Sequence, residues 1–208
     1  MNNPIQKVTT RSLEFITEYL QRYMQMTKDE VELLLQYCEL RYFDKKEIIL
    51  KEGETDNYFS MVVSGLVRKY IRVKKNEVIL QLATEGHMVH SETSFLTRTP
   101  SLVELETLEP TTILSIRYDL MQEALAKYPN GERLGRLILT RMYIKKDERK
   151  HDRAAKTMKE RFLEYVTNHP HMLQRVPQKY LASYLNIKPE TFSRFKHLIR
   201  PNVKSGMS

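Results

Sequence analysis

VPQKYLASYLNIKPETFSRFKHLI, residues 176–199, is the stretch of sequence that decides the fold of the C-terminal part of the chain. Ala182 and Leu185 fall on one face of a helix, and the small side chain of Ala182 allows a second helix to cross closely. The pattern breaks before Ile187, which can fill the space between two helices. Pro189 suits the first turn of the second helix, because its missing N–H would be unpaired there in any case. The stretch therefore predicts a helix-turn-helix.

The second helix of this motif carries side chains of the types that read base pairs. Glu190 and Arg194 are four residues apart and so share one helix face. Arginine can pair with guanine O6 and N7, and glutamate can accept from cytosine N4. The same spacing also suits a surface ion pair, which is the alternative interpretation. The predicted DNA-contacting residues, the first three of them on phosphates, are Gln178, Lys179, Lys188, Glu190, Thr191, Ser193, Arg194 and His197.

The charge of the chain is unevenly divided. Residues 150–208 hold 12 Lys and Arg against 4 Asp and Glu, whereas residues 1–149 hold 22 of each. The net charge of +8 therefore lies entirely in the last part of the chain. A neutral N-terminal part and a basic C-terminal part favour a sensing or scaffolding domain joined to a nucleic-acid-binding domain. A basic surface that serves only solubility is the plainer alternative.

Short β-forming runs fill the middle of the chain and alternate with turn signals at even spacing. Gly53, Gly65 and Gly86 fall at turns that need a positive φ. The pattern predicts an all-β barrel or roll. The seven runs are Leu40–Phe43, Ile48–Lys51, Tyr58–Val63, Leu66–Val73, Val78–Ala83, Leu102–Thr107 and Thr112–Ile116.

Helical patterns flank this β region. Thr27 and Glu30 have the spacing of a capping box. A short helix, Leu120–Lys127, should be closed by Pro129, and a longer one should run from about Glu132 to His151. The longer helix has one apolar stripe, which either packs on its own domain or pairs with a twin in a dimer. The stripe consists of Leu134, Leu137, Ile138 and Met142.

Three further landmarks, taken with the helix-turn-helix, resemble the Crp/Fnr superfamily of bacterial regulators over nearly the whole chain. They are FDKKEIILKEGETDNYFSMVVSGLVRKY (43–70), EVILQLATEGHMVHSETSFL (77–96) and TILSIRYDL (112–120). The resemblance implies an α+β chain in three parts. These are a cyclic-nucleotide-binding-like β-roll with flanking helices over residues 1–130, a long dimerisation helix and hinge over 131–151, and a helix-turn-helix DNA-binding domain over 152–208.

The resemblance also implies partners. Members of the family bind palindromic operators in double-stranded DNA as two-fold dimers, which favours the dimer interpretation of the apolar stripe. RNA polymerase is a further candidate partner, although the sequence marks no surface for it. Pro189 stands where the family often has a base-reading arginine, so an operator of the cyclic-AMP type is not expected. Few residues follow Ile199, and we therefore expect the wing of the domain to be reduced or absent.

The phosphate cassette of the family reads like G-E-[LM]-x-L followed by R-[ST]-A. Here the corresponding residues are HSETSF (90–95) and TPSL (99–102), so Pro100 replaces the arginine. A cyclic phosphate in a partly buried pocket needs a charge-assisted partner, and proline offers no donor. We therefore expect no cyclic-nucleotide effector and no other cofactor.

Three residues remain as candidates for an effector pocket. Glu92 could accept from a ribose hydroxyl, Arg98 could replace the missing arginine from the same side of an extended strand, and Ser101 lies close by. Two alternatives to a regulator that ignores cyclic nucleotides stay open. One is a cyclic-nucleotide-gated activator with the same fold, and the other is an effector-binding or protein-interaction module that no longer binds DNA.

Other classes of protein lack support in the sequence. No phosphate-cradling glycine loop, nucleophile elbow or metal-ligand spacing is present, so an enzyme or a metal site is not expected. Cys38 is the single cysteine, and His87 and His90 are interpreted as ordinary polar or turn histidines. There is no apolar run of membrane-spanning length and no secretory signal, so we expect a cytoplasmic protein.

Overall fold

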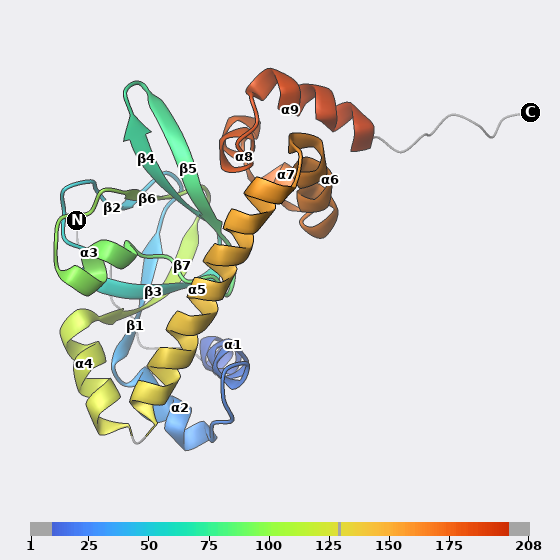
Figure 1. Ribbon diagram of the computed structural model, residues 1–208. Coiled ribbons are helices and arrows are strands. Elements are labelled where there is room, and N and C mark those ends of the chain that lie inside the picture. Colours follow the sequence, from blue (N-terminus) through green and yellow to red (C-terminus); the bar gives the residue numbers. More distant parts are fainter. Residues whose placement is uncertain (1–9, 129, 200–208) are drawn as a thin grey trace, which may run out of the picture. The chain divides into compact units, whose positions relative to one another are not determined.

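The computed structural model describes residues 10–128 and 130–199 of the 208-residue chain. The chain divides into two compact units, one up to Lys145 and the other from Lys146 onward. The helix α5, Gly131–Ala155, runs from the first unit into the second (Figure 1). The region predicted as a hinge is therefore continuous helix. Pro129 and the expected wing after Ile199 lie outside the described residues.

Within the described part of the chain, seven strands form two antiparallel sheets, which together make the predicted β-roll (Figure 1). One sheet has the order β1-β7-β3, and the other has the order β2-β6-β4-β5. All seven predicted runs are found as strands, with ends shifted by at most two residues. The strands are β1 Cys38–Phe43, β2 Ile48–Leu50, β3 Tyr58–Ser64, β4 Val67–Val73, β5 Asn76–Ala83, β6 Glu104–Thr107 and β7 Thr111–Arg117.

Alternation along the three-stranded sheet gives the first unit two apolar cores. Val62 and Ile113 point between the two sheets, where they pack with Val67 and Leu105. Because neighbouring side chains point to opposite faces of a strand, Met61 and Leu114 belong to a second cluster on the outer face. The flanking helices cover that outer face.

The helices of the first unit begin and end where local signals place them. Thr27 caps α2 through a capping box with Glu30, as predicted from their spacing. This helix ends at Leu35, and the single cysteine, Cys38, begins β1. The other helices before α5 are α1 Thr10–Gln21, α3 Glu92–Thr97 and α4 Tyr118–Lys127, with α2 itself spanning Lys28–Leu35.

The second unit is helical and has its own aromatic core. Phe162 and Phe192 are almost completely buried, with ring centroids 5.0 Å apart and ring planes at 88°. Asn186 has a φ of +53° at the turn, and Ile187 is buried beside it as expected. The helices after α5 are α6 Met158–Asn168, α7 Met172–Arg175, α8 Gln178–Tyr184 and α9 Pro189–Lys196, followed by the short 3-10 helix η1 His197–Ile199. The predicted pair of helices joined by a tight turn is thus confirmed as α8 and α9.

Candidate functional site

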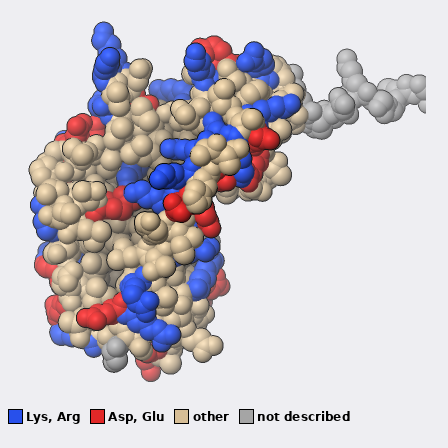
Figure 2. Space-filling model, in the orientation of Figure 1, with Lys and Arg blue, Asp and Glu red and all other residues tan. Residues whose placement is uncertain are grey.

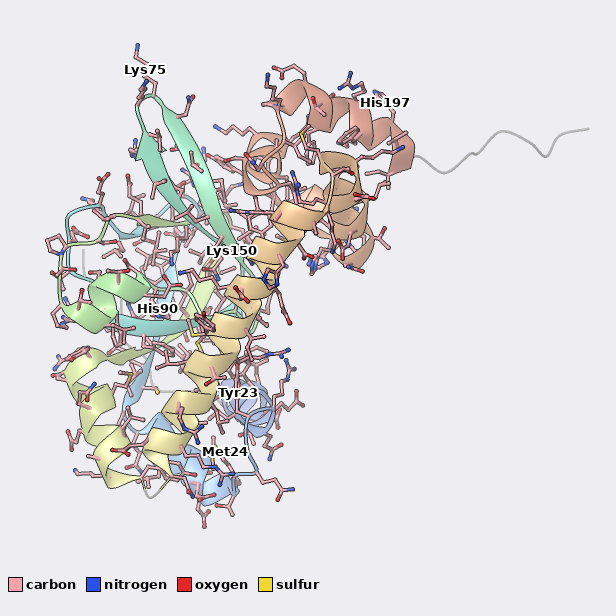
Figure 3. The ribbon with its side chains drawn as sticks, viewed as in Figure 1. Tyr23, Met24, Lys75, His90, Lys150 and His197 are labelled. Atoms are coloured by element: carbon pink, nitrogen blue, oxygen red, sulfur yellow. The ribbon has the colours of Figure 1, made fainter. Side chains whose placement is uncertain are left out.

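The helix α9 presents a polar surface opposite its buried anchor. Phe192 faces the core of the second unit, whereas Lys188, Glu190 and Arg194 are exposed. Pro189 occupies the first turn, as the sequence predicted. The other predicted DNA-contacting residues lie on or beside the same two helices: Lys179, Ser193 and His197 are exposed, and Gln178 and Thr191 are half-buried. Figure 3 labels His197 just after α9.

Glu190 and Arg194 are not paired with each other. No ion pair joins them in the described residues, and the Arg194 guanidinium instead lies 3.5 Å from the Thr191 hydroxyl. The surface ion pair of the alternative interpretation is therefore not formed in the described residues. Both charged groups are available to a ligand outside the helix.

Basic side chains surround this helix pair. Lys179 lies in the first turn of α8, and Lys188 and Lys196 lie at the two ends of α9. Figure 2 shows Lys and Arg side chains gathered on the visible face of the second unit. This distribution agrees with the excess of basic residues in the C-terminal part of the sequence. A surface of this kind attracts a polyanion by a long-range field as well as by direct contacts.

The carboxylate of Glu92, a candidate for effector binding, is already hydrogen-bonded to another side chain of the protein. It accepts a hydrogen bond from the Lys69 ammonium, which also donates to the His90 carbonyl oxygen at 2.9 Å. Burial by itself would raise the pKa of the Glu92 carboxyl, but the charge and hydrogen bond of Lys69 outweigh it and hold the pKa below its usual value. The carboxylate is therefore ionised and already paired.

The side chains of Arg98 and Ser101 also make hydrogen bonds within the chain. The expectation that Arg98 lies on an extended strand is wrong, because it ends α3 with a φ of +58°. Its guanidinium donates to the Asp56 carbonyl oxygen at 2.8 Å and to the Asn57 side chain, and it lies over the Tyr118 ring. The buried Ser101 hydroxyl lies 3.0 Å from the Ser91 hydroxyl and donates to the Val103 carbonyl oxygen. Ser91, which precedes Glu92, connects Ser101 to Asp56, the residue whose carbonyl oxygen accepts from Arg98.

A charged network on the four-stranded sheet was not foreseen from the sequence. The buried Arg68 donates to Glu77 at 2.5 Å and to Glu106 at 2.7 Å. On the same strand, Arg72 and the Tyr70 hydroxyl both donate to Glu104. The signal was present in the run VRKYIRV, which places charged residues inside a strand between buried ones. Breaking one member of such a network is costly, because its partner is left buried without a counter-charge.

His90 is buried, which corrects the expectation of an ordinary polar or turn histidine. The ring, whose residue Figure 3 labels, packs against Phe59 of β3 and Phe95 of α3, with centroids 4.5 Å and 5.8 Å away. Its Nδ1 atom has no hydrogen-bond partner in the described residues. Burial lowers the pKa of His90 to about 4, with Glu92 opposing the shift and Lys69 adding to it. The imidazole is therefore neutral at physiological pH.

The buried imidazole predicts that the first unit loses stability in mild acid. Between pH 6.5 and about 4 the unfolded chain binds a proton at His90 and the folded chain does not. The free energy of unfolding should therefore fall by about 3 kcal/mol as the pH drops through this window. Urea unfolding at several pH values measures the loss. His90→Phe, which keeps a ring between Phe59 and Phe95, should flatten the dependence, and an unchanged slope in this variant would assign it to other groups.

The apolar stripe of α5 is largely used inside the protomer. Leu134 and Ile138 are 4% and 8% exposed and belong to the core of the first unit, and the partly buried Met142 packs against the same cluster. Leu137 is half-buried. The structure therefore supports packing on its own domain, the first of the two alternatives. The exposed large apolar side chains of α5 are instead Leu139, Tyr143 and Ile144.

Among residues 10–128 and 130–199, no helix is both long enough and apolar enough to cross a bilayer. The same residues contain no group of three or more His, Cys, Asp and Glu side chains placed to hold a metal ion.

Most of the first unit resembles a known protein family in sequence. Residues 40–128 match the sequence profile of a family described as cyclic nucleotide-binding domain. These residues include all of the β-roll after the first two residues of β1, and they end after α4. No curated protein matches the sequence.

Solved structures of regulators share the fold over most of the chain. The catabolite activator protein of Thermus thermophilus is 20% identical, with a TM-score of 0.55 over 87% of this chain and 86% of its own. The c-di-GMP-responsive global regulator CLP of Xanthomonas campestris is 17% identical, with a TM-score of 0.64 over 88% of this chain and 96% of its own. DNR of Pseudomonas aeruginosa is 20% identical, with a TM-score of 0.52 over 99% of this chain and 92% of its own. The chain thus carries a segment that matches the cyclic nucleotide-binding domain family, and it has the fold of transcription regulators of the Crp/Fnr type.

Proposed function

We propose that the protein is a sequence-specific DNA-binding regulator that inserts α9 into the major groove of a palindromic operator. The observation that carries this proposal is the surface of α9, where Glu190 and Arg194 are exposed and unpaired with each other while Phe192 anchors the helix from behind. A helix held in this way can present its outer side chains to base edges without having to order itself on binding.

The roles of the polar residues follow from their chemistry. Arg194 would read guanine, and Glu190 would read cytosine. Lys179 and Lys188 would contact phosphates, which position the helix and make binding salt-dependent without reading sequence. Thr191, whose hydroxyl lies 3.5 Å from the Arg194 guanidinium, would orient it.

The proposal includes a homodimer, because a palindrome is read by two helices related by a two-fold axis. The surface that supports it is the exposed apolar side of α5. Leu139 is 44% exposed and Tyr143 is 71% exposed, and both lie on the same side of the helix, one turn apart. This exposed side of α5 replaces the predicted dimer contact, because the predicted apolar stripe is largely packed in the core of the first unit.

Arg194→Ala should weaken binding to the preferred operator by about 1–3 kcal/mol and relax the preference at one base position. The operator is found first by selection from random duplexes at moderate salt, and affinities are then measured by fluorescence anisotropy. A uniform loss over all sequences would make Arg194 a phosphate contact, and the absence of any preferred duplex would refute the proposed function.

Two matched variants serve as controls for this experiment. Lys188→Ala should weaken binding to all duplexes alike and lower the slope of affinity against salt by about one. Lys28→Ala, which removes an exposed lysine from α2 in the first unit, should leave the affinity unchanged.

The proposed regulator does not respond to cyclic nucleotides. Glu92 is neutralised by Lys69, Arg98 is bound to Asp56 and Asn57, and Pro100 has no N–H to offer a phosphate. A cyclic nucleotide would have to displace these internal bonds before making its own. In the anisotropy assay we therefore expect cyclic AMP and cyclic GMP to leave operator affinity unchanged, and a shift of ten-fold or more with either would favour the gated activator.

A further inference from the structure

The first unit contains a cavity of about 180 Å³ between its helices and the outer face of the three-stranded sheet. All lining residues belong to the first unit. Side chains of α1 and α4 form one part of the wall, and Gly135 and Ile138 of α5 form another. Phe59 and Met61 of β3 lie on the sheet side. None of these residues belongs to the surface of α9 or to the candidate effector residues around Glu92.

The cavity wall is almost purely apolar, and the few polar groups in it are already satisfied. The Ser115 hydroxyl lies 2.9 Å from the Ser60 hydroxyl, and the Tyr19 hydroxyl lies 2.7 Å from that of Tyr23, which Figure 3 labels. The Cys38 thiol points to the Leu34 carbonyl oxygen at 3.7 Å. Water needs two to four polar partners, so a cavity of this kind does not hold water well.

The size of the space suits a small organic molecule. An apolar cavity of roughly 150 Å³ in another protein stays dry and binds benzene. This cavity is slightly larger, at about 180 Å³. Met61, Met88 and Met121 are among its lining residues, and the flexible thioether side chain adapts to ligands of different shape.

An entry route lies where lining residues reach the surface. Leu96 of α3 is 51% exposed, and Leu139 of α5 is 44% exposed, and both line the cavity. Exposed leucines at the edge of an apolar space allow a hydrophobic molecule to enter without passing a polar barrier.

We propose that this cavity is a binding site for a small, uncharged hydrophobic molecule of the size of a substituted single aromatic ring. A charged ligand is excluded, because the walls offer neither a counter-charge nor a free hydrogen-bonding group to replace its water. The site uses none of the residues proposed to contact DNA, and Leu139 at its edge is the one lining residue that it shares with the side of α5 proposed for the dimer.

The test uses the full chain and a matched pair of probes. p-Xylene and benzoate have similar ring size, but only benzoate is charged. We expect saturable heat in calorimetry and a rise of a few degrees in the melting temperature with p-xylene, and neither effect with benzoate. Equal responses to the two probes, or no saturable binding of p-xylene, would overturn the proposal.

Gly135→Leu tests the location of the site. A Cβ atom on Gly135 would lie 3.6 Å and 3.9 Å from the methyl groups of Leu125, which is ordinary contact, so a larger side chain extends into the cavity. We expect this variant to lose p-xylene binding, while Leu102→Ala, at an exposed position elsewhere in the unit, keeps it. If both variants bind p-xylene like the original chain, the cavity is not the site.

Two further measurements on the unmodified chain keep the proposal testable if Gly135→Leu fails to fold. 1,3,5-Triisopropylbenzene is too large for the space and should not bind. Analytical ultracentrifugation with and without p-xylene asks whether a second copy of the chain fills the cavity instead. Loss of p-xylene binding whenever the chain self-associates would assign the cavity to that second copy and overturn the proposal.

Discussion

Gly65→Ala should destabilise the first unit by more than about 3 kcal/mol. Gly65 has a φ of +102°, which L side chains rarely adopt. A Cβ atom there would also lie 2.5 Å from the Thr111 Oγ1 atom and 2.7 Å from both the Pro110 carbonyl oxygen and the Thr111 Cα atom. Two of these three atoms are backbone, so the chain at the start of β7 would have to move.

Gly53→Ala is the matched control, because it separates backbone strain from steric overlap. Gly53 has a similar φ of +86°, but a Cβ atom there would meet nothing within 4 Å. Its substitution should cost about 1–2 kcal/mol, the price of a left-handed conformation alone. Urea unfolding followed by circular dichroism measures both variants. Equal losses would show that the approach of Gly65 to Thr111 contributes nothing.

Phe192→Ala should cost about 3–5 kcal/mol and unfold most of the second unit. Phe192 is 1% exposed and meets the equally buried Phe162 edge to face. The substitution removes apolar burial, leaves a cavity and deletes an aromatic contact. Since small domains are only marginally stable, a loss of this size removes the platform for α9 and with it all DNA binding.

Hydrogen exchange of the amides in α6, α8 and α9 measures this effect locally. Leu198→Ala, at a position that is 52% exposed, is the control and should leave exchange within the range of the original chain. Arg194→Ala should also leave exchange unchanged while altering base preference. Loss of operator binding in Phe192→Ala with unaltered exchange would mean that Phe192 touches DNA directly rather than anchoring the helix.

Much of this fold is predictable from the sequence because the decisive signals are local. The capping box of Thr27 and Glu30, the break before Ile187 and the start of α9 at Pro189 each depend on a few neighbouring residues. The strands of the roll follow, in the same way, from β-forming runs between turn signals. Such signals do not depend on which distant parts of the chain meet.

The sequence could not show that the candidate effector residues are already hydrogen-bonded within the chain, because their partners lie in distant segments. Glu92 of α3 meets Lys69 of β4, and Arg98 meets Asp56 and Asn57 from the loop before β3. Spacing along the sequence does not show these pairings. The sequence showed which residue types were present but not which of them would already be paired within the chain.

For a related reason, the sequence could not show whether the apolar stripe of α5 lies in the core of its own unit or on the surface. The i, i+3, i+4 pattern shows that one helix face is buried, and burial against the same chain or against a second copy leaves the same pattern. The positions of α1, α2 and the three-stranded sheet decide that Leu134 and Ile138 are covered from within. The exposed Leu139 and Tyr143 then become the candidates for contact between protomers.

The pairing of β1 with β7 also governs how the chain assembles as it is made. Cys38 pairs with Ile116 and Phe43 with Thr111, so the first strand of the roll finds its partner only after the last strand has been synthesised. Until then β1 is an unpaired edge, the kind of surface at which nascent chains aggregate. The second unit has contacts that are mostly local, and it needs no such wait. Synthesis from the N-terminus therefore exposes the unit with the long-range strand pairing first and for longer.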